Sequence, residues 1–78
     1  MKTRLREFRM ARGLTQMQLA LMTRVTPRTI ISIEKEQYSP SLLLAYRLAL
    51  ALDTTVEELC CLRENLEREE QRYDEEDH

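Results

Sequence analysis

The sequence has few residues that form turns and few aromatic residues. Its 78 residues include one Gly, two Pro, one Phe, three Tyr and no Trp. So few turn-forming residues exclude an architecture of many short strands and long loops, and no run of β-branched residues alternates cleanly with polar ones. A chain of this length forms one small domain with an aliphatic core. The sequence therefore predicts an all-α fold in which short turns join the helices.

Long apolar runs are also missing. No stretch reaches the roughly 18 apolar residues that suggest a membrane-spanning helix. The basic residues near the start are not followed by the apolar core of a signal peptide. We therefore expect no membrane partner and a cytoplasmic location.

Residues that bind metals or act as nucleophiles are scarce. Cys60 and Cys61 are the only cysteines, and His78 is the only histidine. Adjacent positions on a helix point about 100° apart, so the two thiols are poorly placed to share a ligand or to form a bridge. The sequence has no Cys–His pair, no glycine-rich phosphate loop and no plausible pair of buried carboxylates. We expect no metal, no cofactor, no catalytic residue and no enzyme activity, with one cysteine packed as a small hydrophobe and the other partly exposed.

Charged residues are abundant but segregated along the chain, whose net charge is −2. Residues 1–31 carry seven Lys or Arg and one Glu, a net charge of +6. Residues 63–78 carry three Arg and eight Asp or Glu, a net charge of −5. This asymmetry predicts a basic working surface and an acidic extension. We therefore divide the chain into a domain of residues 1–62 and a C-terminal extension of residues 63–78.

The stretch from Leu14 to Glu34, LTQMQLALMTRVTPRTIISIE, predicts two short amphipathic helices joined by a tight turn. Thr15 is a candidate N-cap for a helix over residues 16–22. Thr26 followed by proline starts a second helix over residues 27–35, where the missing N–H of proline costs nothing. The second helix points its isoleucines inward and short polar residues outward. A supported helix that presents its N-terminal residues in this way fits the major groove of DNA.

Two further helices are predicted around this pair. The first covers residues 3–12, buries Leu5, Phe8 and Ala11 on one face, and ends at Gly13 in a left-handed cap. The second, residues 42–52, is capped by Ser39 or Ser41 and is apolar on nearly all sides. Its predicted core stripe is Leu42, Ala45, Leu48, Ala49 and Leu52. A second stripe, Leu43, Tyr46 and Leu50, has little of this short chain left to cover it, which favours a homodimer.

A fifth helix is predicted to start at a capping box formed by Thr55 and Glu58. Leu59, Leu62 and Leu66 continue it at spacings of three and four. The helix either extends past residue 70 and packs on a partner, or ends near Leu66 before a disordered acidic tail. We favour a frayed extension with little order beyond about residue 73. The predicted dimer interface is Leu43, Tyr46, Leu50, Leu62 and Leu66.

From about residue 5 to residue 60, the chain resembles the Cro and phage-repressor type of helix-turn-helix domain, the XRE family. The matching motifs are LTQ at residues 14–16, V-T-x-x-T-I-x-x-I-E at 25–34, Y-x-P-S-L at 38–42 and V-E-E-L at 56–59. The resemblance implies a five-helix repressor-like fold, here with a helical or frayed acidic extension. In this fold, the second and third helices read DNA, commonly in a two-fold dimer on paired half-sites.

The resemblance also implies which residues contact double-stranded DNA. Gln16 would bind a phosphate at the start of the second helix. Arg28 would read a base, because its planar fork fits guanine O6 and N7. The recognition face would comprise Thr26, Pro27, Arg28, Thr29 and Ser32, and the loop residues Lys35, Gln37 and Tyr38 would hold the DNA backbone.

Two structural expectations follow from the same resemblance. Arg9 and Glu34 match a pair that forms an ion pair in relatives and ties the first helix to the third. Arg24, Glu36 and Asp53 stand where glycine is common in the family. A left-handed backbone at such a residue costs roughly 1–2 kcal/mol. Glu36 also places an anion in a loop that is expected to face DNA.

The sequence therefore predicts a sequence-specific DNA-binding transcriptional regulator, most simply a dimeric repressor that reads the major groove with residues 27–35. An alternative is a protein-interaction module or an antitoxin-like binder that uses the same fold, with an unidentified protein partner for the acidic extension. Glu36, Pro27 and the acidic extension favour this alternative.

Overall fold

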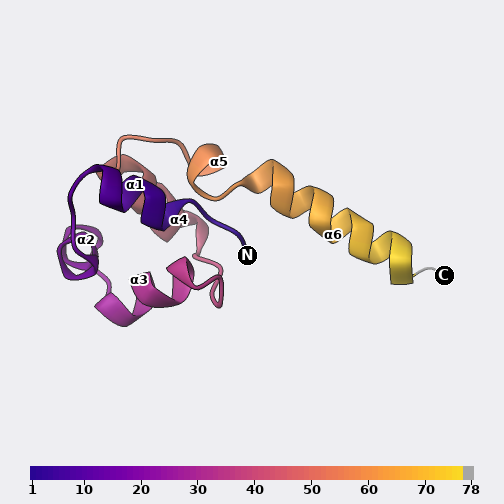
Figure 1. The fold of residues 1–78 in the computed structure, drawn as a ribbon, viewed down its shortest axis with the longest axis horizontal. Helices are drawn as coiled ribbons and strands as arrows, with labels where there is room; N and C mark the ends of the chain where they lie inside the picture. The colour runs from indigo at the N-terminus through magenta and orange to yellow at the C-terminus, as the bar shows by residue number, and fades with distance from the viewer. Residues whose placement is uncertain (77–78) are drawn as a thin grey trace.

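The computed structural model describes residues 1–76, with side chains through Arg72. In this part of the chain, loops join α-helices and there are no strands (Figure 1). Positions 77 and 78 of the predicted acidic extension lie outside the described residues. The helices are α1 (Leu5–Ala11), α2 (Gln16–Thr23), α3 (Pro27–Glu34), α4 (Leu42–Ala51), α5 (Val56–Leu59) and α6 (Leu62–Glu76). The predicted all-α fold is confirmed for the described residues.

Most helix starts follow the predicted caps. Thr15 forms a full capping box with Gln18, and the Ser41 hydroxyl accepts a hydrogen bond from the Leu44 N–H. Thr26 precedes Pro27 as predicted, but its hydroxyl pairs with the Thr29 hydroxyl at 3.3 Å instead of with a backbone N–H of α3. The hydroxyl of a cap residue can pair with a neighbouring side chain or with a backbone N–H. The residue type therefore predicts where the helix starts more reliably than it predicts the hydrogen bond that the hydroxyl makes.

The predicted capping box of α5 forms only in part. The Thr55 hydroxyl accepts from the Glu58 N–H at 3.2 Å. The Glu58 carboxylate accepts from the Thr54 hydroxyl at 3.0 Å instead of reaching back to the Thr55 N–H. A neighbouring hydroxyl thus replaces the backbone donor.

The core lies where α1 to α5 meet. Its buried apolar side chains are Leu5, Leu19, Ala20, Ile30, Ile33, Leu44, Ala45, Leu48, Ala49, Leu52, Leu59 and Cys60, with Phe8 half-buried beside them. Ala11 is exposed, so the core-facing side of α1 is shorter than predicted. Gly13 has φ +67°, the predicted left-handed cap after α1.

The predicted core stripe of α4 is wrong at its first position. Leu42 is 77% exposed, whereas Leu44 is 7% exposed and packs in the core. The other four predicted positions of the stripe are buried. Because Ser41 caps the helix, Leu42 lies in the first turn at the edge of the core, and Leu44 occupies the position one turn before Leu48.

The helix predicted from residue 56 onward is broken. α5 ends at Leu59, Cys61 has φ +48°, and α6 begins at Leu62 in a new direction. A left-handed residue interrupts an α-helix. α6 then continues to Glu76, and the expected lack of order beyond about residue 73 stays a prediction.

The two cysteines occupy this break, and both are buried. The prediction that one of them is partly exposed is wrong, because Cys61 is only 8% exposed. Burial raises the pKa of the Cys60 thiol, which keeps it protonated. These thiols therefore act as small apolar side chains in the junction.

α6 projects from the rest of the molecule (Figure 1). The molecule measures 46 × 22 × 20 Å along its principal axes, and the long dimension follows this helix. α6 packs mainly on α5 at its base. None of the described helices is both long and apolar enough to cross a membrane.

Candidate nucleic-acid interface

The turn between α2 and α3 closes on a left-handed arginine. Arg24 has φ 61° and ψ 41°, and the Val25 N–H donates to the Ala20 carbonyl at 3.0 Å. The buried Thr23 hydroxyl donates to the Leu19 carbonyl at 2.8 Å. These bonds satisfy carbonyls at the end of α2, as a left-handed end cap does in helices that finish in glycine. The turn therefore fixes the angle of α3 without a glycine.

α3 has one buried side and one open side. Ile30 and Ile33 are fully buried in the core. The residues of the predicted recognition face are exposed at Thr26, Pro27 and Arg28 and half-buried at Thr29 and Ser32. The N-terminal half of α3 is thus rigidly supported from behind and open in front, which is the arrangement that groove binding requires.

A shallow hollow joins α3 to the loop that follows it. It is lined by Thr26, Arg28, Thr29, Ser32, Gln37 and Tyr38. The structure therefore brings the predicted recognition face, except Pro27, together with two of the three predicted loop residues. The third, Lys35, lies beside a second hollow.

The loop after α3 bends at Glu36, which has φ 62°. The Gln37 N–H donates to the Ser32 carbonyl, and the Glu36 N–H donates to the Ile33 carbonyl, both at 3.0 Å. This bend places Gln37 and Tyr38 back against α3. The exposed carboxylate of Glu36 lies in the same loop, so the predicted conflict between this anion and a DNA surface persists.

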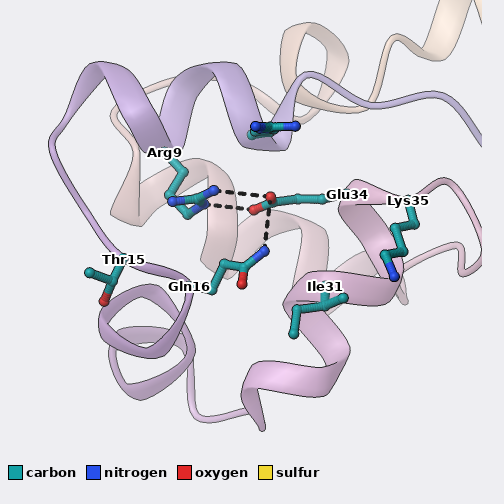
Figure 2. Close-up of a pocket in the computed structure, with 7 residues that line it drawn as sticks. Arg9, Thr15, Gln16, Ile31, Glu34 and Lys35 are labelled. Atoms are coloured by element: carbon teal, nitrogen blue, oxygen red, sulfur yellow. Dashed lines mark hydrogen bonds and ion pairs between the residues drawn. The ribbon is translucent and has the colours of Figure 1, made fainter.

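The second hollow contains an ion pair between α1 and α3 (Figure 2). Arg9 donates from Nε to Glu34 Oε2 at 2.7 Å and from Nη2 to Oε1 at 3.1 Å. The third donor, Nη1, reaches the Leu14 carbonyl at 2.8 Å. The side chains are only 12% and 6% exposed, and the hydrogen bonds to Glu34 raise the pKa of Arg9 despite partial burial. The pair expected from the resemblance is therefore present and is bidentate.

Gln16 points into this hollow from the start of α2 (Figure 2). Its Nε2 donates to Glu34 Oε1 at 3.3 Å, so the ion pair also orients the amide. The family resemblance implies a phosphate contact for Gln16, and the sequence does not predict its hydrogen bond to Glu34. An amide nitrogen carries two hydrogens, so one N–H of Gln16 remains for another acceptor.

Arg6 is the residue that sequence reasoning missed in this region. It lines the same hollow as Arg9, Gln16 and Lys35. Arg6 lies one helical turn before Arg9, and this spacing of three was the available signal. Together, Arg6 and Lys35 place two cationic side chains around the start of α2.

Exposed apolar side chains also lie on α4 and at the base of α6, and these two sets together are called the apolar surface. Leu43, Tyr46 and Leu50 are exposed on α4, as the second stripe predicted, and Leu42 adds to them. Leu62 and Leu66 are exposed on α6. These are the residues of the predicted dimer interface, and they are distinct from those that line the two hollows.

The sequence is similar to that of helix-turn-helix proteins. The family described as helix-turn-helix matches residues 5–59. An HTH-type transcriptional regulator of Methanothermobacter thermautotrophicus is 56% identical over 52 residues, which cover 67% of this chain and 75% of that protein. Another, from Archaeoglobus fulgidus, is 46% identical over 59 residues, 76% of this chain and 84% of that protein. The biological processes of both are uncharacterised.

Two solved structures share the fold. One is the restriction-modification controller protein C.AhdI of Aeromonas hydrophila, with a TM-score of 0.66 and 38% identity over 70% of this chain and 83% of that one. The other is the clp gene regulator ClgR of Corynebacterium glutamicum, with a TM-score of 0.68 and 25% identity. The match to ClgR covers 95% of this chain and 85% of that one, so it includes most of α6.

Proposed function

The chain belongs to the XRE family of helix-turn-helix proteins, and on this basis we propose that it is a sequence-specific DNA-binding transcriptional regulator that acts as a dimeric repressor. The observation that carries this proposal is the open N-terminal side of α3, supported by Ile30 and Ile33. Its exposed, mostly polar N-terminal side chains suit contact with base edges in a major groove. Occupancy of an operator that overlaps a promoter would repress transcription without a ligand.

Base reading is assigned to the exposed end of α3. Arg28 has the fork that accepts guanine O6 and N7 together, which is worth about 1–3 kcal/mol of discrimination. Thr29 and Ser32 offer hydroxyls within the same hollow. Thr26 stands at the start of the helix, and Pro27 offers only an apolar contact, which suits the methyl group of thymine.

Phosphate contacts are assigned to the two ends of the reading unit. Gln16 and the free N–H groups of α2 face one phosphate, and Arg6 and Lys35 add positive charge there. Gln37 and Tyr38 in the loop after α3 hold the backbone on the other side. Such contacts position the protein on the duplex and make the affinity strongly salt-dependent.

A second copy of the chain is the proposed partner of the apolar surface. Leu43, Tyr46 and Leu50 form a stripe on α4, and Leu62 and Leu66 lie one turn apart on α6. An isolated helix of fifteen residues is marginal in water, so α6 needs a packing surface. A two-fold dimer supplies one and also places two copies of α3 on paired half-sites.

The test is selection of bound sequences from a random DNA pool, repeated with Arg28→Ala and with Arg12→Ala. Arg12 is exposed after the end of α1, outside the two hollows and the proposed dimer interface, so this control removes the same charge elsewhere. The wild type should enrich a paired motif. Arg28→Ala should lose preference at one base position of each half-site, with its thermal stability nearly unchanged. Unchanged selectivity in Arg28→Ala would refute its reading role.

A protein-interaction module or antitoxin-like binder is the second candidate. Its supporting observation is Glu36, whose exposed carboxylate lies in the loop assigned to the DNA backbone. The acidic α6 would then mask a protein partner. A salt titration with random DNA and with selected DNA separates the two proposals, because an interaction module would bind neither in a salt-sensitive way.

A further inference from the structure

The direction in which α6 leaves the domain is set at its first turn. Cys61 takes a left-handed conformation, and α6 starts at the next residue, so no linker separates the helix from the core. Cys60 and Cys61 are both buried at this point. The orientation of α6 is therefore a structural property of the junction.

Asn65 secures this junction with its whole side-chain amide. Its Nδ2 carries two hydrogens and lies 2.7 Å from the Cys60 carbonyl and 3.1 Å from the Cys61 carbonyl, two neighbouring acceptors just after the end of α5 that share one hydrogen. The same nitrogen donates to the Lys2 carbonyl at 2.9 Å, and Oδ1 accepts from the Lys2 N–H at 3.0 Å. One side chain of α6 thus joins the break between the helices to a segment 63 residues earlier in the sequence.

The N-terminal segment is itself attached to the core. The Arg4 N–H donates to the Leu59 carbonyl at 2.8 Å, and Lys2 Nζ lies 2.7 Å from Glu64 Oε2. The Lys2–Glu64 pair is exposed and adds little to stability. Asn65 is partly buried and joins two backbone segments, Lys2 and the Cys60–Cys61 break, so its side chain holds the tilt of α6.

This tilt bears on which DNA a dimer can read. The proposed interface includes both the α4 stripe and Leu62 and Leu66 of α6, so the tilt that the junction gives α6 sets how these two parts of the interface meet and at what angle the two domains are held. A rotation of about 10° moves a point about 20 Å away by about 3.5 Å, the rise of about one base pair. We propose that Asn65 is a specificity-determining residue that fixes the spacing of the two half-sites. The inference rests on the proposed function, a DNA-binding dimer.

The experiment measures binding to duplexes that carry the selected half-sites at spacings from two base pairs shorter to two longer than the optimum. The variants are Asn65→Ala and the isosteric Asn65→Asp, which replaces a donor to three carbonyls with an oxygen. The control is Glu67→Ala, an exposed residue of the same helix. Far-UV circular dichroism and the mass in solution establish that each variant is folded and dimeric.

We expect the wild type and Glu67→Ala to favour one spacing. Either Asn65 variant should lower this preference by about tenfold, within the usual range for coupling between two sites, while the base preference within a half-site stays the same. Retention of the wild-type spacing profile in a folded, dimeric Asn65 variant would overturn the proposal. So would loss of folding in both variants, which would make Asn65 a folding residue. If the wild type enriches no paired motif, the proposed function fails instead.

Discussion

At the scale of single residues, four of the described residues other than glycine have a left-handed backbone that suits glycine: Cys61, at φ 48°, and three others. Arg24, Glu36 and Asp53 have φ between 54° and 62°, at the three positions where the family resemblance leads one to expect glycine. Each such residue costs roughly 1–2 kcal/mol in steric strain. The core of a 78-residue chain tolerates this cost only because α1 to α5 share one compact apolar cluster.

Glu36→Gly should relieve strain at one of these positions. Because glycine also raises the entropy of the unfolded chain, the net gain is about 0.5–1 kcal/mol, which raises Tm by roughly 2–8 °C. Thermal unfolding at a fixed protein concentration measures the change. The matched control, Glu36→Gln, removes the charge and keeps the strain, so it should leave Tm nearly unchanged. A lower Tm for Glu36→Gly would show that the loop needs the glutamate side chain.

Residue-level predictions succeeded where the signal was local. Thr15 and Ser41 mark helix starts because a hydroxyl before an apolar period leaves few alternatives. The hydrogen bond from Gln16 to Glu34 was not predictable, because it depends on how α2 and α3 cross. The Arg9–Glu34 pair was expected only through the resemblance, since no local pattern links residues 25 positions apart.

At the scale of elements, α4 shows that the sequence of a helix that is apolar on nearly all sides does not reveal which side faces the core. Leu42, Leu43 and Leu44 are consecutive, so hydrophobicity alone could not decide which of them faces the core. The break at Cys61 was not predicted because neither glycine nor proline stands there to indicate the end of a helix. A sequence pattern predicts the end of a helix poorly when tertiary packing imposes the left-handed conformation on a residue that does not favour turns.

The exposed stripe of α4 gives an element-scale prediction. Leu43→Glu combined with Leu50→Glu should yield monomers in size-exclusion chromatography with light scattering, because four like charges would meet across a two-fold interface. A matched pair, Met17→Glu with Leu21→Glu, places the same charges on exposed positions of α2 and should leave the mass unchanged. A dimer that persists in the α4 double variant would place the interface elsewhere.

At the scale of the whole molecule, charge is divided between two ends. The basic residues concentrate in α1 to α3, and the acidic residues concentrate in α6. This division was visible in the sequence before any fold was known. Which basic residues share a surface was not, and the shared hollow of Arg6 and Lys35 became evident only from the packing of α1 against α3.

The acidic helix should weaken non-specific DNA binding through long-range repulsion. Replacing Glu67, Glu69 and Glu70 with Gln keeps the length of α6 and removes three negative charges. We expect affinity for random DNA to rise by roughly 3- to 10-fold at low salt and the difference to vanish at high salt. Fluorescence anisotropy across a salt series measures both effects. An unchanged or weaker affinity at low salt would show that the acidic helix lies too far from the DNA to act or contributes to assembly.

The projection of α6 away from the domain ties its folding to the amount of protein present. In the proposed dimer, the part of α6 beyond its anchored first turn would gain most of its burial from a second molecule, so dilution below the dissociation constant should fray that part while α1 to α5 stay folded. A cell that makes little of this protein would then hold monomers with a frayed acidic arm. Under the proposed dimerisation, the arm would become a stable helix only once enough copies accumulate, which would give the regulator a threshold in its own abundance.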